Sequence, residues 1–539
     1  MSAALEVSAT GAAADAISTH VPALVAEKFA SRLFGRDAAL WGDETEAEAG
    51  VRLGWVDLHR TSRPLVGEVA ALREELREEG VDHVVLCGMG GSSLAPEVIC
   101  AAAGVELTVL DSSHPDQVRS ALSDRLDRTV VVVSSKSGST VETDSQRRAF
   151  VAAFEEAGIE PARRVVVVTD PGSPLDEQSR DGGYRVVNAD PFVGGRYSAL
   201  TAFGLVPTGL AGVDIEGLLD DAEAVADLLA TDDEANPALR LGATMAGTEP
   251  LRDKLILVDE GSGLPGFADW TEQLIAESPG KGGVGVLPVV VTDSSCPEVA
   301  LPPQDATVAR LVGDSDGEDH RGGPSGSEVT VSGSLGAQLL LWEVATAAAG
   351  RLLGINPFDQ PDVESAKSAA RSMLEGEPDH TPADAVDGAV EIRALGGDWL
   401  GGAATVRGAL DALLDQLDDD AGYLAVMAYL DRIRDTDLSD VRRSLAIRTR
   451  RPVTFGWGPR FLHSTGQLHK GGPPVGVFLQ VTGAIESDLP VAGRDYTFGD
   501  LITAQAAGDA RVLADHGRPV LRLHLTDVSG LAVVAEALA

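Results

Sequence analysis

The chain has 539 residues, 44% of them hydrophobic, and a formal net charge of −40 at pH 7. This length exceeds what one hydrophobic core organises, so we expect two domains or one large two-lobed body. The hydrophobic content excludes a disordered chain, the negative charge argues against a nucleic-acid partner, and no apolar run approaches the roughly 18 residues that cross a bilayer.

The three cysteines, Cys87, Cys100 and Cys296, show no CxxC or other metal-binding spacing. We expect them to be buried free thiols in a reducing compartment. The N-terminus lacks a basic segment followed by a hydrophobic one, so no secretory signal is predicted. We therefore expect a cytoplasmic protein with no membrane partner.

Residues 1–60 are rich in alanine with scattered apolar positions, which predicts an N-terminal helical packing segment. Residues 61–240 alternate helical segments with short apolar runs, and strands are expected at 83–87, 107–110, 130–133 and 165–168, with a possible fifth at 186–187. This alternation predicts an α/β domain in which helices cover both faces of a mostly parallel sheet.

Residues 241–539 read as a second α/β domain. Strands are expected at 254–258, 286–291, 423–429, 453–455, 475–481 and 520–525. A helical segment is inserted at about 335–400, beginning with an apolar helix over 335–353. Two stretches lack periodicity: 312–328 is predicted to be a surface loop, and 374–400 a linker or lid.

The densest polar motif is the hydroxyl-rich stretch from Ser134 to Thr140, which directly follows the valine-rich strand at 130–133. Backbone N–H groups and hydroxyls at the start of a helix can hold a phosphate without a metal. The alternative is a polar turn in which Ser or Thr caps the helix. Five hydroxyls and Lys136 exceed what a cap needs, which favours a phosphate-binding cradle.

A glycine-rich loop, GMGGSS at 88–93, follows the preceding strand. It is no dinucleotide fingerprint, because GxGxxG would need glycine where Ser93 stands. A tight strand-to-helix turn alone would explain the loop. Two such loops at neighbouring strand ends, however, converge on one crevice and together favour a ligand that carries phosphate.

Charged residues follow later strands and helices. Arg196 comes after a glycine pair, while Gln273 and Glu277 share one face of a helix. Lys367 lies three residues after Glu364, as in an exposed ion pair, and His463 lies in a glycine-rich loop beyond a strand. Each could be an ordinary surface or structural residue when taken alone.

Taken together, these motifs resemble the glucose-6-phosphate isomerase family, most closely the isomerase part of proteins in which it is fused to a transaldolase. The matching motifs are GMGGSS (88–93), SSKSGST (134–140), GGRYS (194–198), QLIAESPGK (273–281), INPFDQPDVESAK (355–367) and FLHSTGQ (461–467). The resemblance implies two sugar-isomerase-type (SIS) domains, at 61–240 and 241–539. It also implies reversible isomerisation of glucose 6-phosphate and fructose 6-phosphate through a cis-enediolate.

The resemblance assigns roles to individual residues. Glu277 would carry the proton, Arg196 would stabilise the enediolate, and His463 with Lys367 would open the sugar ring. The substrate would be bound by Gly91, Ser92, Ser135, Lys136, Ser137, Thr140, Gln273 and Gln360. The family implies a homodimer and needs neither metal nor cofactor.

The chain departs from the family in the order of two motifs. The histidine loop usually precedes the FDQP helix, whereas here Lys367 precedes His463. We therefore expect a rearranged second domain, and His469 is a nearby competitor for the histidine role. Two alternative functions are an isomerase that also accepts mannose 6-phosphate and a non-catalytic sugar-phosphate sensor. The sensor would need neither Glu277 nor Lys367.

Overall fold

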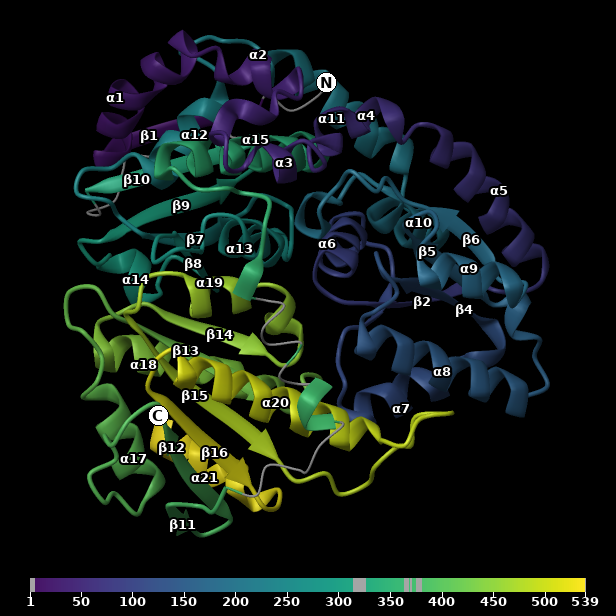
Figure 1. Ribbon diagram of the computed structural model, residues 1–539, viewed down its shortest axis with the longest axis vertical. Helices are drawn as coiled ribbons and strands as arrows, with labels where there is room; N and C mark the ends of the chain where they lie inside the picture. Colours follow the sequence, from purple (N-terminus) through teal and green to yellow (C-terminus); the bar gives the residue numbers. More distant parts are fainter. Residues whose placement is uncertain (1–4, 314–325, 363–367, 369–370, 375–380, 539) are drawn as a thin grey trace.

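The structure is a computed structural model that describes residues 5–313, 326–362, 368, 371–374 and 381–538. Within these ranges the strands form three sheets that are mainly parallel and covered by helices, which confirms the predicted α/β class (Figure 1). The first sheet lies on the right of Figure 1, and the other two lie on the left.

The first sheet has the order β3-β2-β4-β5-β6, and all its strands run parallel. Its strands are β2 (His83–Gly88), β3 (Thr108–Leu110), β4 (Thr129–Ser134), β5 (Val165–Thr169) and β6 (Arg185–Asn188). All five strands were predicted. From β2 the chain first adds β3 on one side and then adds β4, β5 and β6 on the other side, so the switch point of the sheet lies between β2 and β4. Ligands bind at such a switch point in doubly wound sheets.

Side chains alternate across β4 into two different cores. Val130 and Val132 pack on one face, while Val131 and Val133 pack on the other. Helices of this part are α5 (Pro64–Glu78), α6 (Leu94–Ala102), α7 (Pro115–Ser123), α8 (Val141–Glu156), α9 (Pro174–Asp181) and α10 (Ala202–Ala211). The first sheet with these helices is called the first lobe below.

The second sheet has the order β1-β10-β9-β7-β8, with β1 antiparallel to β10 and the other pairs parallel. Its strands are β1 (Glu6–Gly11), β7 (Lys254–Glu260), β8 (Leu287–Val291), β9 (Ala306–Val312) and β10 (Ser327–Ser332). The helical prediction for residues 1–60 is therefore wrong at its start, because β1 completes the edge of this sheet. Strands β9 and β10 were not predicted, and most of the expected loop at 312–328 lies outside the described residues.

One face of the second sheet is covered by long helices, among them α15, whose predicted bounds are confirmed. They are α1 (Ala12–Ala26), α11 (Ile215–Leu229), α12 (Pro237–Ala246), α13 (Phe267–Glu277) and α15 (Leu335–Leu353). Shorter helices are α2 (Phe29–Phe34), α3 (Glu46–Ala49), α4 (Leu58–Thr61) and α14 (Pro297–Ala300). The other face packs against the third sheet, where Ile256 and Val258 share a core with Tyr423 and Phe478.

The third sheet has the order β11-β12-β16-β15-β13-β14. Its strands are β11 (Ala385–Asp387), β12 (Val390–Leu395), β13 (Tyr423–Tyr429), β14 (Val453–Trp457), β15 (Gly476–Gly483) and β16 (Val520–Leu525). The linker or lid expected at 374–400 is wrong over 385–395. There β12 runs antiparallel to β16, and Val390 and Ile392 are fully buried. The strands after residue 240 thus form two sheets.

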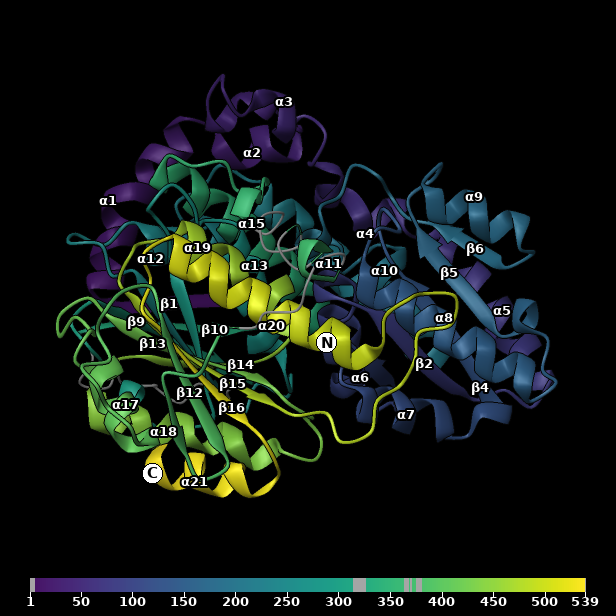
Figure 2. The same ribbon diagram turned by 60° about the horizontal axis from the view of Figure 1, so that its bottom comes forward.

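The remaining helices surround the third sheet and connect it to the first lobe. They are α17 (Val406–Leu414), α18 (Val441–Thr449), α19 (Gly466–Gly471), α20 (Phe498–Asp515) and α21 (Ser529–Leu538). Figure 2 shows the segment before α20 lying against α8, where Arg494 pairs with Asp144. No helix in the described ranges is both long and apolar enough to span a bilayer. The domain limits 1–60, 61–240 and 241–539 stay predictions.

Candidate active site

The hydroxyl-rich stretch lies at the switch point of the first sheet, between the end of β4 and the start of α8. Ser135 is buried, and its Oγ donates a hydrogen bond to Thr140 Oγ1 at 3.3 Å. Thr140 occupies the N-cap position of α8, yet its side chain makes no capping hydrogen bond. The hydroxyl is therefore not used as a cap, which favours the cradle over the capping alternative. Ser137 and Ser139 are exposed, with their Oγ atoms 2.6 Å apart.

The glycine-rich loop at the end of β2 lies beside this cradle, since Gly88 pairs with Ser134 in the sheet. A Cβ at Gly91 would lie 1.9 Å from the carbonyl oxygen of Gly195, and one at Gly90 would lie 2.6 Å from that of His463. Both positions therefore need glycine. Ser92, which is half-buried, ends the short 3-10 turn formed by this loop.

Arg196 is the centre of a buried polar network. Its Nε donates to Ser278 Oγ at 2.8 Å, and its Nη1 donates to Gln360 Oε1 at 2.9 Å. Its Nη2 donates to the main-chain carbonyl of Pro357 at 2.7 Å. The network joins the segment between β6 and α10 in the first lobe to the end of α13 and to the segment after α15.

Glu277 is the last residue of α13 and is 4% exposed. Its Oε2 lies 3.8 Å from Arg196 Nη1 and accepts a hydrogen bond of 3.3 Å from Gln273 Nε2. The same Gln273 amide donates to the carbonyl of His463 at 2.8 Å. The structure thus brings together four residues of the predicted site, Arg196, Gln273, Glu277 and, through its main-chain carbonyl, His463.

His463 ends a 3-10 turn, η8 (Arg460–His463), that follows β14. Its Nε2 lies 2.9 Å from Glu142 Oε1 on the first turn of α8, and both side chains are nearly buried. Gln505 on α20 donates to the same carboxylate oxygen at 2.6 Å. A carboxylate that faces an imidazole nitrogen fixes the orientation of the ring.

The competing histidine lies elsewhere. His469 on α19 is fully enclosed, and its Nδ1 lies 2.9 Å from the hydroxyl of Tyr423. Burial, with help from Lys470 and Arg518, lowers the pKa of His469 to about 3. The ring therefore stays neutral over the physiological range, and the structure favours His463 over His469 at the site.

Lys281 adds a second cation next to Arg196. Its Nζ donates to both the carboxylate and the main-chain carbonyl of Asp359. Burial and the nearby Arg196 guanidinium lower the pKa of Lys281 to about 8. The end of the site next to Glu277 thus carries a cation that titrates near physiological pH.

One predicted residue is not brought to the substrate space. Lys136 turns away from the cradle, because its Nζ pairs with Asp170 at 2.9 Å and donates to the carbonyls of Pro191 and Val193. Lys367 lies outside the described residues. The start of its segment is fixed, since Asp362 accepts a hydrogen bond of 2.6 Å from Gln467 of the histidine loop. That contact ties the two motifs whose order is reversed.

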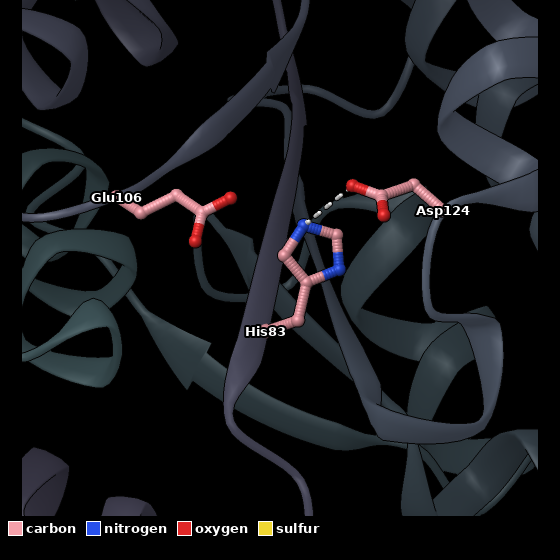
Figure 3. Close-up of side chains that lie close together, drawn as sticks. All are labelled: His83, Glu106 and Asp124. Carbon is pink, nitrogen blue, oxygen red and sulfur yellow. Dashed lines mark ion pairs between the residues drawn. The ribbon is translucent and has the colours of Figure 1, made fainter.

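Two groups of described residues place possible metal ligands close together. They are His83, Glu106 and Asp124 (Figure 3) and His114, Asp116 and Asp431, with ligand atoms within 4.8 Å of one another in each group. Arg125 pairs with both carboxylates of the first group, and Arg119 and Arg434 pair with Asp116 of the second. Because arginines already pair with Glu106, Asp124 and Asp116, we assign a metal to neither group.

Sequence reasoning missed Glu142, Ser278 and Gln505. Glu142 stands two residues after the cradle in the first turn of α8, where an acid is ordinarily explained by the helix dipole. Ser278 lies within the QLIAESPGK motif, so its position was visible although its bond to Arg196 was not. Gln505 carried no signal, because its partner lies 363 residues away.

Comparison with known proteins identifies the relatives of this chain. The family model of phosphoglucose isomerase matches residues 74–246. Proteins named probable glucose-6-phosphate isomerase from Haloarcula marismortui and Natronomonas pharaonis are each 30% identical, over 55% and 60% of this chain and 79% and 86% of their own lengths. A glucose-6-phosphate isomerase from Gloeothece citriformis is 29% identical over 54% of this chain, and the match spans 66% of that relative.

Solved structures agree with these matches. A hypothetical protein from Thermus thermophilus is 26% identical, with a TM-score of 0.57 over 69% of this chain and 100% of its own. A glucose-6-phosphate isomerase from Chlamydia trachomatis shares the fold, with 23% identity and a TM-score of 0.51 over 65% of this chain and 78% of its own. The two relatives that are 30% identical, of which the matches span 79% and 86%, show that this chain belongs to the glucose-6-phosphate isomerase family.

Proposed function

We propose that this protein is a glucose-6-phosphate isomerase that interconverts glucose 6-phosphate and fructose 6-phosphate. The observation that carries the proposal is the buried cluster of Glu277, Arg196 and Gln273 beside the hydroxyl cradle. A carboxylate held next to a guanidinium, at a fixed place beside a phosphate-binding loop, is what a proton transfer between neighbouring carbons requires.

The cradle would anchor the phosphate at C6, remote from the reacting carbons. Ser135, Ser137 and Thr140 offer hydroxyls, and the first N–H groups of α8 have no acceptor within the helix. Ser92 on the neighbouring loop extends this surface. Binding energy gained at the phosphate can then orient C1 and C2 against Glu277.

Glu277 would remove the proton from C2 of the open-chain aldose, leaving an enediolate across C1 and C2. Arg196 would stabilise the negative charge that develops on the enediolate oxygens. Glu277 then returns a proton to C1, while a proton moves from the oxygen on C2 to the oxygen on C1. The product is the ketose, and the carboxylate is regenerated without a cofactor being consumed.

Ring opening precedes this transfer and needs an acid for the ring oxygen and a base for the hydroxyl on C1. We assign it to His463, whose imidazole is oriented by Glu142, and to Lys367, whose role rests on the family resemblance. Gln360, which accepts a hydrogen bond from Arg196, would face the substrate near C2. Lys136 would contribute indirectly, by fixing the cradle through Asp170.

A coupled assay that follows formation of glucose 6-phosphate from fructose 6-phosphate tests the proposal. The unaltered protein should show activity, and Glu277→Gln should retain substrate binding while losing roughly 100-fold or more in turnover. Near-normal turnover in that variant would reject the role of Glu277. The same assay with mannose 6-phosphate decides whether the enzyme has dual specificity.

Three further features belong to the proposal. Family membership suggests a homodimer, which sedimentation would test. The cysteines, all buried and free, fit a reducing cytoplasm. The special likeness to the isomerase part of transaldolase fusions rests on the six motifs alone.

A further inference from the structure

Arg460 opens the turn η8 that ends at His463, and it is held by the first lobe. Its Nη1 donates to Asp111 Oδ2 at 2.6 Å, and its Nη2 lies 2.5 Å from Glu97 Oε2. Asp111 follows β3 and Glu97 lies on α6. The side chain of Asp111 is fully buried and that of Arg460 is 16% exposed, so solvent screens the Arg460–Asp111 pair poorly.

A second arginine reaches the same two carboxylates. Arg432 lies 3.4 Å from Glu97 and 3.5 Å from Asp111. Burial would raise the pKa of Glu97, but Arg460 and Arg432 together hold it below its ordinary value. Glu97 therefore stays charged near neutral pH. Removal of Arg460 would leave both carboxylates with Arg432 as their remaining arginine partner, at 3.4 and 3.5 Å.

The spacing along η8 couples this cluster to His463. Residues three apart in a 3-10 helix lie above one another, so Arg460 and His463 share one side of the turn. Arg460 meets the end of β3 and α6, while His463 meets Glu142 on α8. The first lobe thus holds the turn at both of its ends.

We infer that Arg460, through Asp111 and Glu97, is a positioning residue that aims His463 at the ring oxygen of the substrate. This inference rests on the proposed function and adds a residue that acts on ring opening alone. Proton transfer at Glu277 should depend far less on Arg460, because the Glu277 carboxylate lies on α13 and contacts Gln273 and Arg196. Its link to η8 is indirect, through the bond from Gln273 to the main-chain carbonyl of His463.

A substrate that cannot close a ring separates the two steps. Removal of O4 and O5 from glucose 6-phosphate leaves an aldehyde that needs no ring opening. Arg460→Gln should lower kcat/KM for glucose 6-phosphate by about 100-fold, as misplacement of a catalytic group does. The same variant should change kcat/KM for the ring-blocked analogue by less than about threefold.

Two further variants distinguish positioning from a general structural role. Arg460→Lys keeps the charge but loses the fork that spans two carboxylates, so an intermediate loss of about tenfold is expected. If Arg460→Gln does not fold, Arg460→Lys can be used instead to compare the two substrates. In the double variant with His463→Ala, Arg460→Gln should add less than about twofold, since it acts through the missing imidazole.

Arg434 provides the matched control. It also joins the first lobe to the loop after β13, through Asp116 at 3.2 Å, but its side chain is 53% exposed and it lies outside η8. Arg434→Gln should leave both substrates unaffected. The inference would be overturned if Arg460→Gln lowered kcat/KM equally for both substrates, or if Arg434→Gln caused the same loss. It would also be overturned if the losses of the two single variants multiplied in the double variant. Inactivity of the unaltered protein on glucose 6-phosphate would instead reject the proposed function.

Discussion

Replacing Arg196 by lysine should destabilise the fold, because a lysine cannot reproduce the network around the guanidinium. The three nitrogens of Arg196 donate four hydrogen bonds, at 2.7 to 3.2 Å, to Ser278 Oγ, Gln360 Oε1 and the main-chain carbonyls of Pro357 and Asp359. A lysine ammonium donates all its hydrogen bonds from one nitrogen. It cannot reach acceptors that are arranged around the three separate nitrogens of a guanidinium. If two buried acceptors lose their partner at about 1–3 kcal/mol each, the free energy of unfolding falls by about 2–6 kcal/mol.

Denaturant unfolding of Arg196→Lys measures this loss, with Arg185→Lys as the control. Arg185 forms an exposed pair with Glu75, so its replacement should change the free energy of unfolding by less than about 0.5 kcal/mol. Turnover of Arg196→Lys should also fall by about 100-fold or more, because the charge no longer lies where the enediolate develops. Stability equal to that of the control would refute the network argument, and normal turnover would refute the role of Arg196 in the reaction.

Two other predictions concern the cradle and the second cation. The double variant Ser135→Ala, Thr140→Ala should raise KM by about 10- to 100-fold with little change in kcat, because hydroxyl contacts to a charged phosphate are lost. An unchanged KM in steady-state assays would reject the cradle. Burial and Arg196 lower the pKa of Lys281 to about 8. Activity should therefore decline as the pH rises through 8, because Lys281 loses its positive charge and the ion pair with Asp359 is lost. Lys281→Arg should stay active to higher pH, because its guanidinium remains protonated, whereas an identical alkaline limb would contradict this. Between about pH 8 and 10.4 the unfolded lysine binds more proton than the folded one, so this group's contribution to the free energy of unfolding should increase with pH.

The first sheet could be predicted because each of its strands is a short apolar run between helices. The valines from Val130 to Val133 are buried on both faces, which only a sheet covered on both sides allows. The strand ends then placed the cradle and the glycine-rich loop side by side. The order of the strands, with the switch point between β2 and β4, comes from the structure.

The second and third sheets were harder to predict, because several strands depend on distant partners. Strand β1 pairs with β10 more than 300 residues later in the chain, and β12 pairs with β16 near the C-terminus. Residues 390–395 carry two charged side chains and lie near several glycines, so their composition suggested a linker. Residues 390–395 form a strand because Val390 and Ile392 are buried and the segment pairs with β16. A single sequence does not show that pairing.

The reversed order of the histidine and FDQP motifs is resolved in part by the structure. Gln467, four residues after His463, donates to Asp362 at 2.6 Å, so the two motifs meet in space although their order is exchanged. The partner of His463 could not be predicted in the same way. Glu142 lies 321 residues before the histidine, and its carboxylate resembles an ordinary acid at the start of a helix.

Proton transfer by Glu277 is the central claim, and deuterium incorporation tests it most directly. Fructose 6-phosphate would be incubated with the protein in D₂O, and the product followed by NMR. We predict glucose 6-phosphate that carries deuterium at C2, formed by the unaltered protein and slowed roughly 100-fold or more by Glu277→Gln. No conversion, or equally fast conversion and labelling by the Glu277→Gln variant, would contradict the claim.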